Sequence, residues 1–164
     1  MGYAAHVVGM NAFHLKSIAL YSLLLFPALH GCAGKEPAPN TTAEAGQSLY
    51  QKLGGAEGVT RLADQWGFSI ARHSELNQIL DSAATAEVEA GFTHDVMGVS
   101  GMTPSTTTTL ATALAGKGLT EVHVAALSAT LREAGALLGI NPTVMSTAAS
   151  TIVEPAARTA MGMH

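Results

Sequence analysis

The sequence predicts an all-α fold, and three observations support this prediction. The first is an apolar stripe at helical spacing, formed by Val59, Leu62, Trp66 and Ile70. The second is a longer stripe with the same spacing, formed by Val124, Leu127, Leu131, Ala134 and Leu138. Residues spaced by three and four lie on one face of a helix, so both stripes are expected to face a core. The third is that no stretch alternates apolar and polar residues over the length of a strand.

Length and composition are those of one domain of ordinary size with short appendages. The chain has 164 residues, of which 12% are charged, and its formal net charge is −4. With no basic run, the sequence gives no support for nucleic-acid binding. The single cysteine, Cys32, excludes an intramolecular disulfide, and no Cys/His spacing matches a zinc site.

Residues 1–31 are predicted to be a secretory signal peptide, with Met10 as an alternative start of the chain. Its apolar run, residues 17–29, is too short to cross the ~20-residue hydrocarbon core of a membrane. The run ends in Leu29-His30-Gly31-Cys32, which is similar to the lipobox of bacterial lipoproteins. That resemblance implies cleavage before Cys32 and lipidation of its thiol. The alternative is an ordinary cleaved signal peptide that leaves the thiol free.

Residues 32–46 are predicted to be the lipidated cysteine and a flexible tether, because the segment is small, polar and proline-containing. The folded domain is then residues 47–164. Neither residue after the cysteine, Ala33 or Gly34, is aspartate. By resemblance to enteric lipoproteins, this favours an exported protein anchored at the periplasmic face of the outer membrane.

The middle of the domain is expected to contain a second amphipathic helix over residues 86–99. A break at residues 81–85 precedes it, where serine and threonine suit an N-cap. The apolar face of this helix is formed by Val88, Phe92, Val96 and Val99. Residues 101–109 carry a proline and a run of threonines, which favour a loop.

The last two helices are marked by signals at their ends. Thr120 is expected to cap the helix that carries the second stripe, and Gly139 to end it. Asn141 followed by Pro142 is a favoured start for the final helix. Pro155 is expected to kink or close that helix, because proline has no N–H to donate.

Four short motifs together resemble group 1 truncated haemoglobins. Residues 49–55 (LYQKLGG) are similar to the family's opening, and residues 116–124 (GKGLTEVHV) to its Gly-x-Gly-Ile-Thr-x-x-His-Phe segment. Residues 139–142 (GINP) resemble its Gly-Val-Pro corner, and residues 152–155 (IVEP) its Ile-Val-Ala-Pro ending. Their order and spacing agree over about residues 48–158. The resemblance implies a truncated-globin sandwich of two helices on two around haem, which binds oxygen or nitric oxide.

The resemblance also implies which residues line the haem pocket. They are Trp66, Leu80, Val88, Phe92, Leu114 and Val124. Leu114 stands where the family has its proximal histidine, and leucine has no lone pair for iron. No histidine occurs between Asp95 and Val122, so a shifted alignment does not supply one. Haem is therefore implied as the cofactor, but its binding is expected to be weak or lost.

The distal side departs from the family pattern as well. By alignment, Gly67 stands where members commonly have a tyrosine that bonds oxygen, and Leu80 replaces a phenylalanine that stacks on the porphyrin. Phe92 stands where the family often has glutamine. These three differences lie on separate segments, and like Leu114 they predict weak or lost haem binding.

Two histidines are the weaker candidates for a metal ligand, and no metal ligand is assigned. His94 lies about 200° around its helix from Phe92 and is expected to face solvent. His123 is expected to pack at the surface or at a helix start. His94 and Asp95 are adjacent on a helix, so they are expected to point apart rather than to form an acid/base pair. With no nucleophile motif and no phosphate loop, no catalytic residue is assigned.

Three functions stay open. The first is an envelope-anchored protein of the truncated-haemoglobin type. As a working haem protein it would bind oxygen or nitric oxide, or move electrons, through an iron ligand that the sequence does not identify, whereas Leu114 predicts weak or lost haem binding. The second is a haem-free module of globin fold that binds an apolar ligand or a protein partner. The third is a structural envelope lipoprotein without a small ligand. In all three, the expected membrane contact is the lipid at Cys32.

Overall fold

The computed structural model describes residues 46–163, and all regular structure in this part of the chain is helical. The elements are α1 (Leu49–Lys52), α2 (Gly55–Arg72), the 3-10 turn η2 (Leu76–Gln78), α3 (Ser82–Val99), α4 (Leu110–Leu114), α5 (Glu121–Leu137), α6 (Pro142–Ala148), the π turn η3 (Ala149–Val153) and α7 (Glu154–Ala160). The all-α prediction is confirmed for these residues. The predictions on the signal peptide, Cys32 and residues 32–45 of the tether lie outside them.

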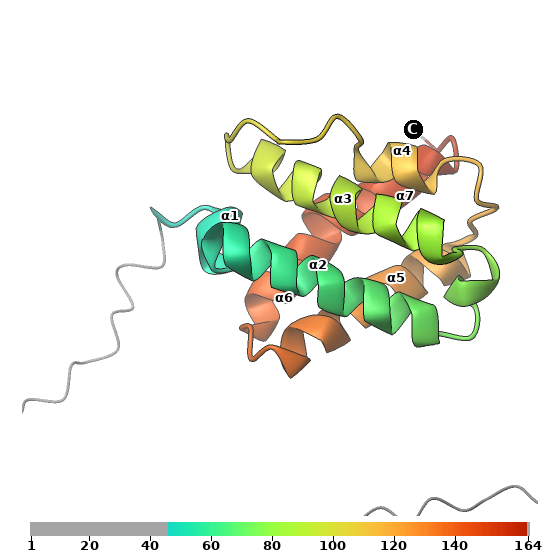
Figure 1. Cartoon of the computed structure of the whole chain (residues 1–164), viewed down its shortest axis with the longest axis horizontal. Coiled ribbons are helices and arrows are strands. Elements are labelled where there is room, and N and C mark those ends of the chain that lie inside the picture. Colours follow the sequence, from blue (N-terminus) through green and yellow to red (C-terminus); the bar gives the residue numbers. More distant parts are fainter. Residues whose placement is uncertain (1–45, 164) are drawn as a thin grey trace, which may run out of the picture. The chain divides into compact units, whose positions relative to one another are not determined.

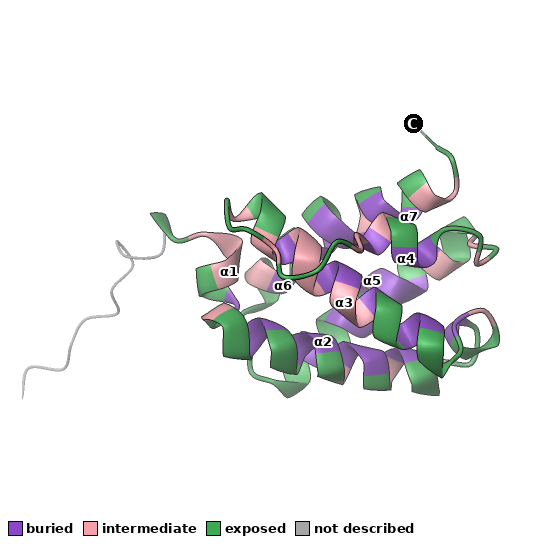
Figure 2. Cartoon of the chain, turned by 45° about the horizontal axis from the view of Figure 1, so that its top comes forward, coloured by how far each residue is buried: buried purple, intermediate pink, exposed green. Residues whose placement is uncertain are grey.

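The helices pack as two layers around a shared core. Helices α2 and α3 lie side by side in front, and α5, α6 and α7 lie behind them (Figure 1). Helix α2 packs against both α3 and α5, while α4 packs against α3 and α7. Figure 2 shows the buried residues of α2 turned toward the other helices and its exposed residues on the outer side. Within the described residues, no helix is both long and apolar enough to cross a membrane.

The first predicted stripe forms the inner face of α2, as expected. Val59, Leu62, Trp66 and Ile70 are all buried. The Trp66 indole Nε1–H donates to two acceptors on α5, the Leu127 carbonyl at 3.2 Å and Thr130 Oγ1 at 3.1 Å. The expected corner before α2 is also present. Gly54 and Gly55 have φ of 94° and 68°, left-handed values that glycine adopts without strain.

Helix α3 begins four residues earlier than predicted. Asp81 is its N-cap, and its Oδ1 accepts from the Ala84 N–H at 2.8 Å, so residues 82–85 are helical rather than a break. Val88, Phe92 and Val96 are buried as predicted. The prediction for Val99 is wrong, because this side chain is 60% exposed. Helix α4 covers α3 near Gly91 and Asp95, and Val99 lies beyond that contact.

Helix α5 has the predicted ends. The Thr120 N–H donates to His123 Nδ1 at 3.0 Å, which satisfies a group at the helix start. Gly139, with φ of 72°, turns the chain after the last residue of the helix. The stripe is buried from Val124 to Ala134, but Leu138 is 37% exposed and the prediction that it faces the core is wrong. Leu138 follows the end of the helix, so helical spacing no longer sets its direction.

Pro155 does not close the final helix. Asn141 Oδ1 accepts from the Thr143 N–H at 2.8 Å and starts α6 as predicted. The chain then passes through η3 into α7, which continues to Ala160. In η3 the Glu154 N–H reaches the Ala149 carbonyl, five residues back. The distortion expected at Pro155 therefore appears as a wider turn just before it, which lets the helix pass a residue without an N–H.

We expect Leu131→Ala to lower the free energy of unfolding by about 2–5 kcal/mol, because it removes a fully buried side chain and leaves a cavity. The control is Leu137→Ala on the same helix, whose side chain is 66% exposed. Exposed substitutions of this kind change stability by about 0.5 kcal/mol or less. Urea unfolding of both variants measures the difference. Equal effects would show that the inner face of α5 is misassigned.

Candidate functional site

The six residues predicted to line a haem pocket all belong to one hydrophobic core. They are Trp66, Leu80, Val88, Phe92, Leu114 and Val124. The Trp66 and Phe92 rings meet edge to face, with centroids 5.2 Å apart and planes at 64°. The structure thus brings these residues together as packed core. Their role as the lining of a haem pocket stays a prediction.

Helices α3 and α4 touch at the place where the resemblance implies a cofactor between them. Phe92, which the resemblance assigns to the distal side, lies on α3, and Leu114, which it assigns to the proximal side, is fully buried on α4. A Cβ added to Gly91 would lie 2.7 Å from both Cα and N of Leu110. A real Cβ does not fit at such a distance, so position 91 has to be glycine. The backbones of α3 and α4 are therefore in direct contact one turn before Leu114.

A hydrogen-bonded chain reinforces this contact. Asp95 Oδ2 accepts from the Leu110 N–H at 3.1 Å, which satisfies the first amide of α4. Asp95 Oδ1 lies 2.8 Å from His94 Nδ1. The expectation that His94 and Asp95 point apart is therefore wrong. The hydrogen bond from the Leu110 N–H holds the Asp95 carboxylate toward α4. In this orientation the second carboxylate oxygen of Asp95 lies within hydrogen-bond distance of the His94 imidazole.

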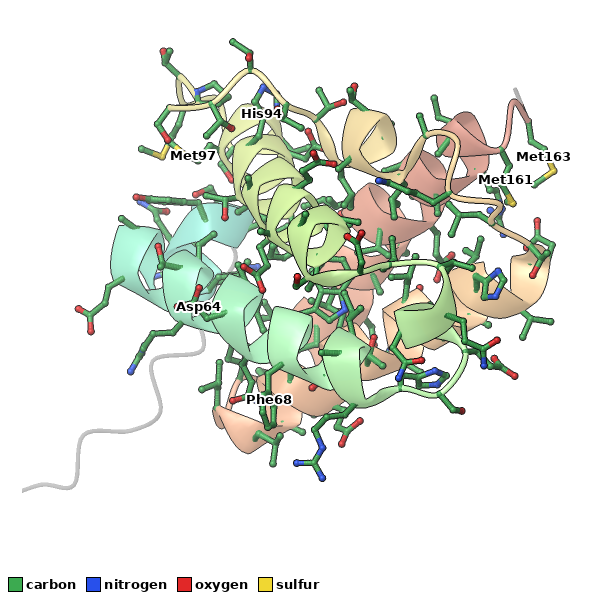
Figure 3. All side chains as sticks on the ribbon, turned by 45° about the vertical axis from the view of Figure 1, so that its right-hand side comes forward. Asp64, Phe68, His94, Met97, Met161 and Met163 are labelled. Atoms are coloured by element: carbon green, nitrogen blue, oxygen red, sulfur yellow. The ribbon has the colours of Figure 1, made fainter. Side chains whose placement is uncertain are left out.

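His94 is also less exposed than expected, since 22% of its side chain is accessible. It lies near the end of α3 on the same stretch as Met97 (Figure 3). It borders a groove of about 400 Å³ between α3, the start of α4 and the last helix, lined in part by Ile152, Pro155 and Thr159. The carboxylate fixes one imidazole nitrogen and leaves Nε2 for other contacts. The dyad connects α3 to α4, so a structural role accounts for it fully.

The second histidine candidate has its own role in the fold. His123 Nδ1 accepts the Thr120 N–H at the start of α5, and the Thr120 hydroxyl lies 3.1 Å from the same nitrogen. Over residues 46–163, no group of three or more His, Cys, Asp or Glu side chains gathers to hold a metal ion.

Sequence reasoning missed the residues that cover Gly67. A side chain at Gly67 would overlap the carboxylate of Glu89, which leans across from α3. Burial raises the pKa of Glu89, and the negative charge of Asp64 raises it further. Glu89 lies three residues before Phe92, and this spacing alone could have placed it beside the apolar face. Gly67 and Glu89 border a second groove, of about 440 Å³, between α2 and the first half of α3.

Comparisons of this chain with protein-family models, with curated proteins and with solved structures gave no match. The resemblance to truncated haemoglobins therefore depends on the motifs quoted from the sequence.

We expect Gly91→Ala to destabilise the domain by about 1–3 kcal/mol, the usual cost of forcing extra volume into a packed site. The added methyl group has to displace α4 from α3. Gly98→Ala is the control on the same helix, because a Cβ there meets nothing within 4 Å. That change should be neutral or stabilising by up to about 1 kcal/mol. Thermal unfolding compares the two variants, and similar losses would contradict a close contact at Gly91.

Proposed function

We propose that the domain is a truncated-haemoglobin-like sandwich that has lost haem and serves as a binding module. The observation that carries the proposal is the backbone contact between α3 and α4 at Gly91 and Leu110. The motif order along the chain supports the family, and the two-layer packing of α2 and α3 on α5, α6 and α7 is compatible with it. The contact lies where the family resemblance requires room for a flat cofactor.

The side chains present do not suit haem. A globin holds its iron through one imidazole, and Leu114 at that position is buried and has no lone pair. His94 is bound to Asp95, and His123 is engaged at the start of α5. Neither histidine is fully buried, in contrast to Phe92 and Leu114.

The free energy of apolar burial also argues against haem binding in the core. Burial of a porphyrin would contribute about 25 cal/mol per Å² of apolar surface removed from water. Here the apolar surfaces of α3 and α4 already bury each other. Haem entry would first expose those surfaces, which offsets most of the gain. Ligand or partner binding is therefore proposed for the outer grooves of the domain rather than for its core.

The proposal includes a lipid anchor, supported by Leu29-His30-Gly31-Cys32 and by the polar tether that follows. The module would then act from the periplasmic face of the outer membrane.

We expect mass spectrometry of the membrane fraction to find the mature protein beginning at a diacylated Cys32. The variant Cys32→Ser should lose membrane association, because its side chain offers no thiol for the lipid. A mature form that begins elsewhere and is unaffected by Cys32→Ser would contradict the anchor. It would leave the haem-free proposal untouched.

We expect haemin titration of the purified protein to give no sharp Soret band of a histidine-ligated species. From spacing alone, Leu114→His should create such a band. The packed α3–α4 contact changes this expectation, because an imidazole at position 114 would lie inside a closed core. We therefore expect Leu114→His to lower the thermal stability without yielding a stoichiometric haem complex. A His-type spectrum in the unmodified protein would overturn the proposal.

A further inference from the structure

A groove between the outer faces of α2 and α5 carries a positive and a negative side chain that do not pair with each other. Arg72 on α2 and Glu133 on α5 border it, and its volume is about 310 Å³. Both side chains are exposed. In the part of the chain that the structure describes, neither takes part in an ion pair. Opposite charges placed in this way can both bind one molecule that lies between them.

The floor of the groove is fixed by a hydrogen bond that joins the two helices. The Trp66 Nε1–H donates to Thr130 Oγ1 at 3.1 Å, and Thr130 borders the groove from below. Thr130 is 3% exposed, and its hydroxyl also donates to the Ala126 carbonyl at 2.9 Å, so it is engaged within the fold. The groove side chains above it are therefore mounted on two helices whose relative position is set, which favours a defined binding geometry.

Arg72 is positioned by an aromatic ring. Its guanidinium carbon lies 5.2 Å from the centroid of the Phe68 ring. The ring attracts the cation over its face, while the N–H donors of a guanidinium lie in its own plane. A guanidinium held through its face therefore keeps donors at its edge, in the fork geometry that fits a carboxylate. Gln65 and Ser69, both half-buried on the same face of α2, add an amide and a hydroxyl to this wall.

Exposed apolar side chains form the rest of the groove. Phe68 is 56% exposed and Leu137 is 66% exposed, and both border the groove. Phe68 lies on the face of α2 that is turned away from His94 and Met97 (Figure 3). A volume of about 310 Å³ is at the lower end of the range for small-molecule sites, so the ligand has to be small.

An α-amino acid has the chemistry that this groove requires. Its carboxylate accepts from a guanidinium, and its ammonium has donors but no acceptor, so it suits a carboxylate. Both charges are attached to one carbon, which lets a single small molecule bridge Arg72 and Glu133. An apolar side chain on the same carbon would lie against Phe68 and Leu137. A simple anion or a simple cation would leave one of the two protein charges without a partner.

We propose that this groove binds a free α-amino acid with an apolar side chain. Its carboxylate contacts Arg72, its ammonium contacts Glu133, and its side chain packs on Phe68 and Leu137. The proposal names a ligand class for the binding module proposed above and in that respect rests on it. None of the groove residues is among the six predicted to line a haem pocket. Haemin titration and amino-acid titration can therefore fail separately.

The test is a titration of the purified full chain with L-phenylalanine, followed by amide NMR. Phenethylammonium, which lacks the carboxylate, and hydrocinnamate, which lacks the ammonium, serve as probes of the same size. Saturable shifts confined to residues 65–73 and 130–137 are expected with phenylalanine. Each singly charged probe should bind about tenfold more weakly or worse, the cost of one charge-assisted contact. Absence of shifts, shifts elsewhere, or equal binding of either probe would overturn the proposal.

Two variants assign the two charges of the ligand. Arg72→Gln should weaken binding of phenylalanine and hydrocinnamate about tenfold and leave phenethylammonium unchanged. Glu133→Gln should weaken phenylalanine and phenethylammonium and leave hydrocinnamate unchanged. Both side chains are exposed, so both variants should keep the thermal midpoint of the parent protein. Loss of all three probes in either variant would contradict the assigned orientation.

Matched controls lie on α5 outside the groove. Arg132 is 46% exposed and pairs with Glu154 at 3.7 Å, and Glu121 is 62% exposed and pairs with Arg158 at 3.9 Å. Arg132→Gln and Glu121→Gln change the net charge by the same amounts as the two test variants. Both should bind phenylalanine as the parent protein does. Losses equal to those of Arg72→Gln and Glu133→Gln would assign the effect to overall charge and overturn a specific site.

Discussion

Trp66 is the residue on which the two layers depend. Its indole N–H is fully buried and donates to both Leu127 and Thr130 on α5, and its ring packs edge to face on Phe92 of α3. A buried indole N–H without acceptors would be costly, so α5 has to place a carbonyl and a hydroxyl at this point. One side chain of α2 thereby fixes the position of α5 behind it and α3 beside it.

The helices with a sustained apolar stripe were predictable from the sequence, and the short or unusual elements were not. Periodicity placed α2 and α5, because each presents several turns of spaced apolar residues. Helix α4 has five residues, too few for a repeat to appear, and it is held by contacts with α3 and α7. The early start of α3 was missed, because Asp81 and four small or polar residues read equally well as a break.

The candidate site also has features that the sequence predicts and features that it does not. Burial of the six core residues could be predicted from helical spacing and family resemblance. The direct contact of α3 with α4 could not, because it depends on tertiary placement of Gly91 against a loop-flanked helix. Helical spacing also gave a wrong prediction for His94 and Asp95, which were expected to point apart. Their orientation is set by the backbone N–H of Leu110 on another helix. Likewise, only the folded chain reveals that Arg72 and Glu133 share a groove with Phe68.

The π turn at Ala149–Val153 has a consequence for any sequence alignment of this chain. A turn closed by a bond to the fifth residue back contains one residue more than an α-helical turn. Residues of α7 are therefore offset by one position from the register that α6 would set if it continued as a regular helix. An ungapped alignment with an uninterrupted helix would match the inward positions of α6, but after η3 each matched position would be turned by about 100° around the helix axis. A single-residue insertion belongs within residues 149–153.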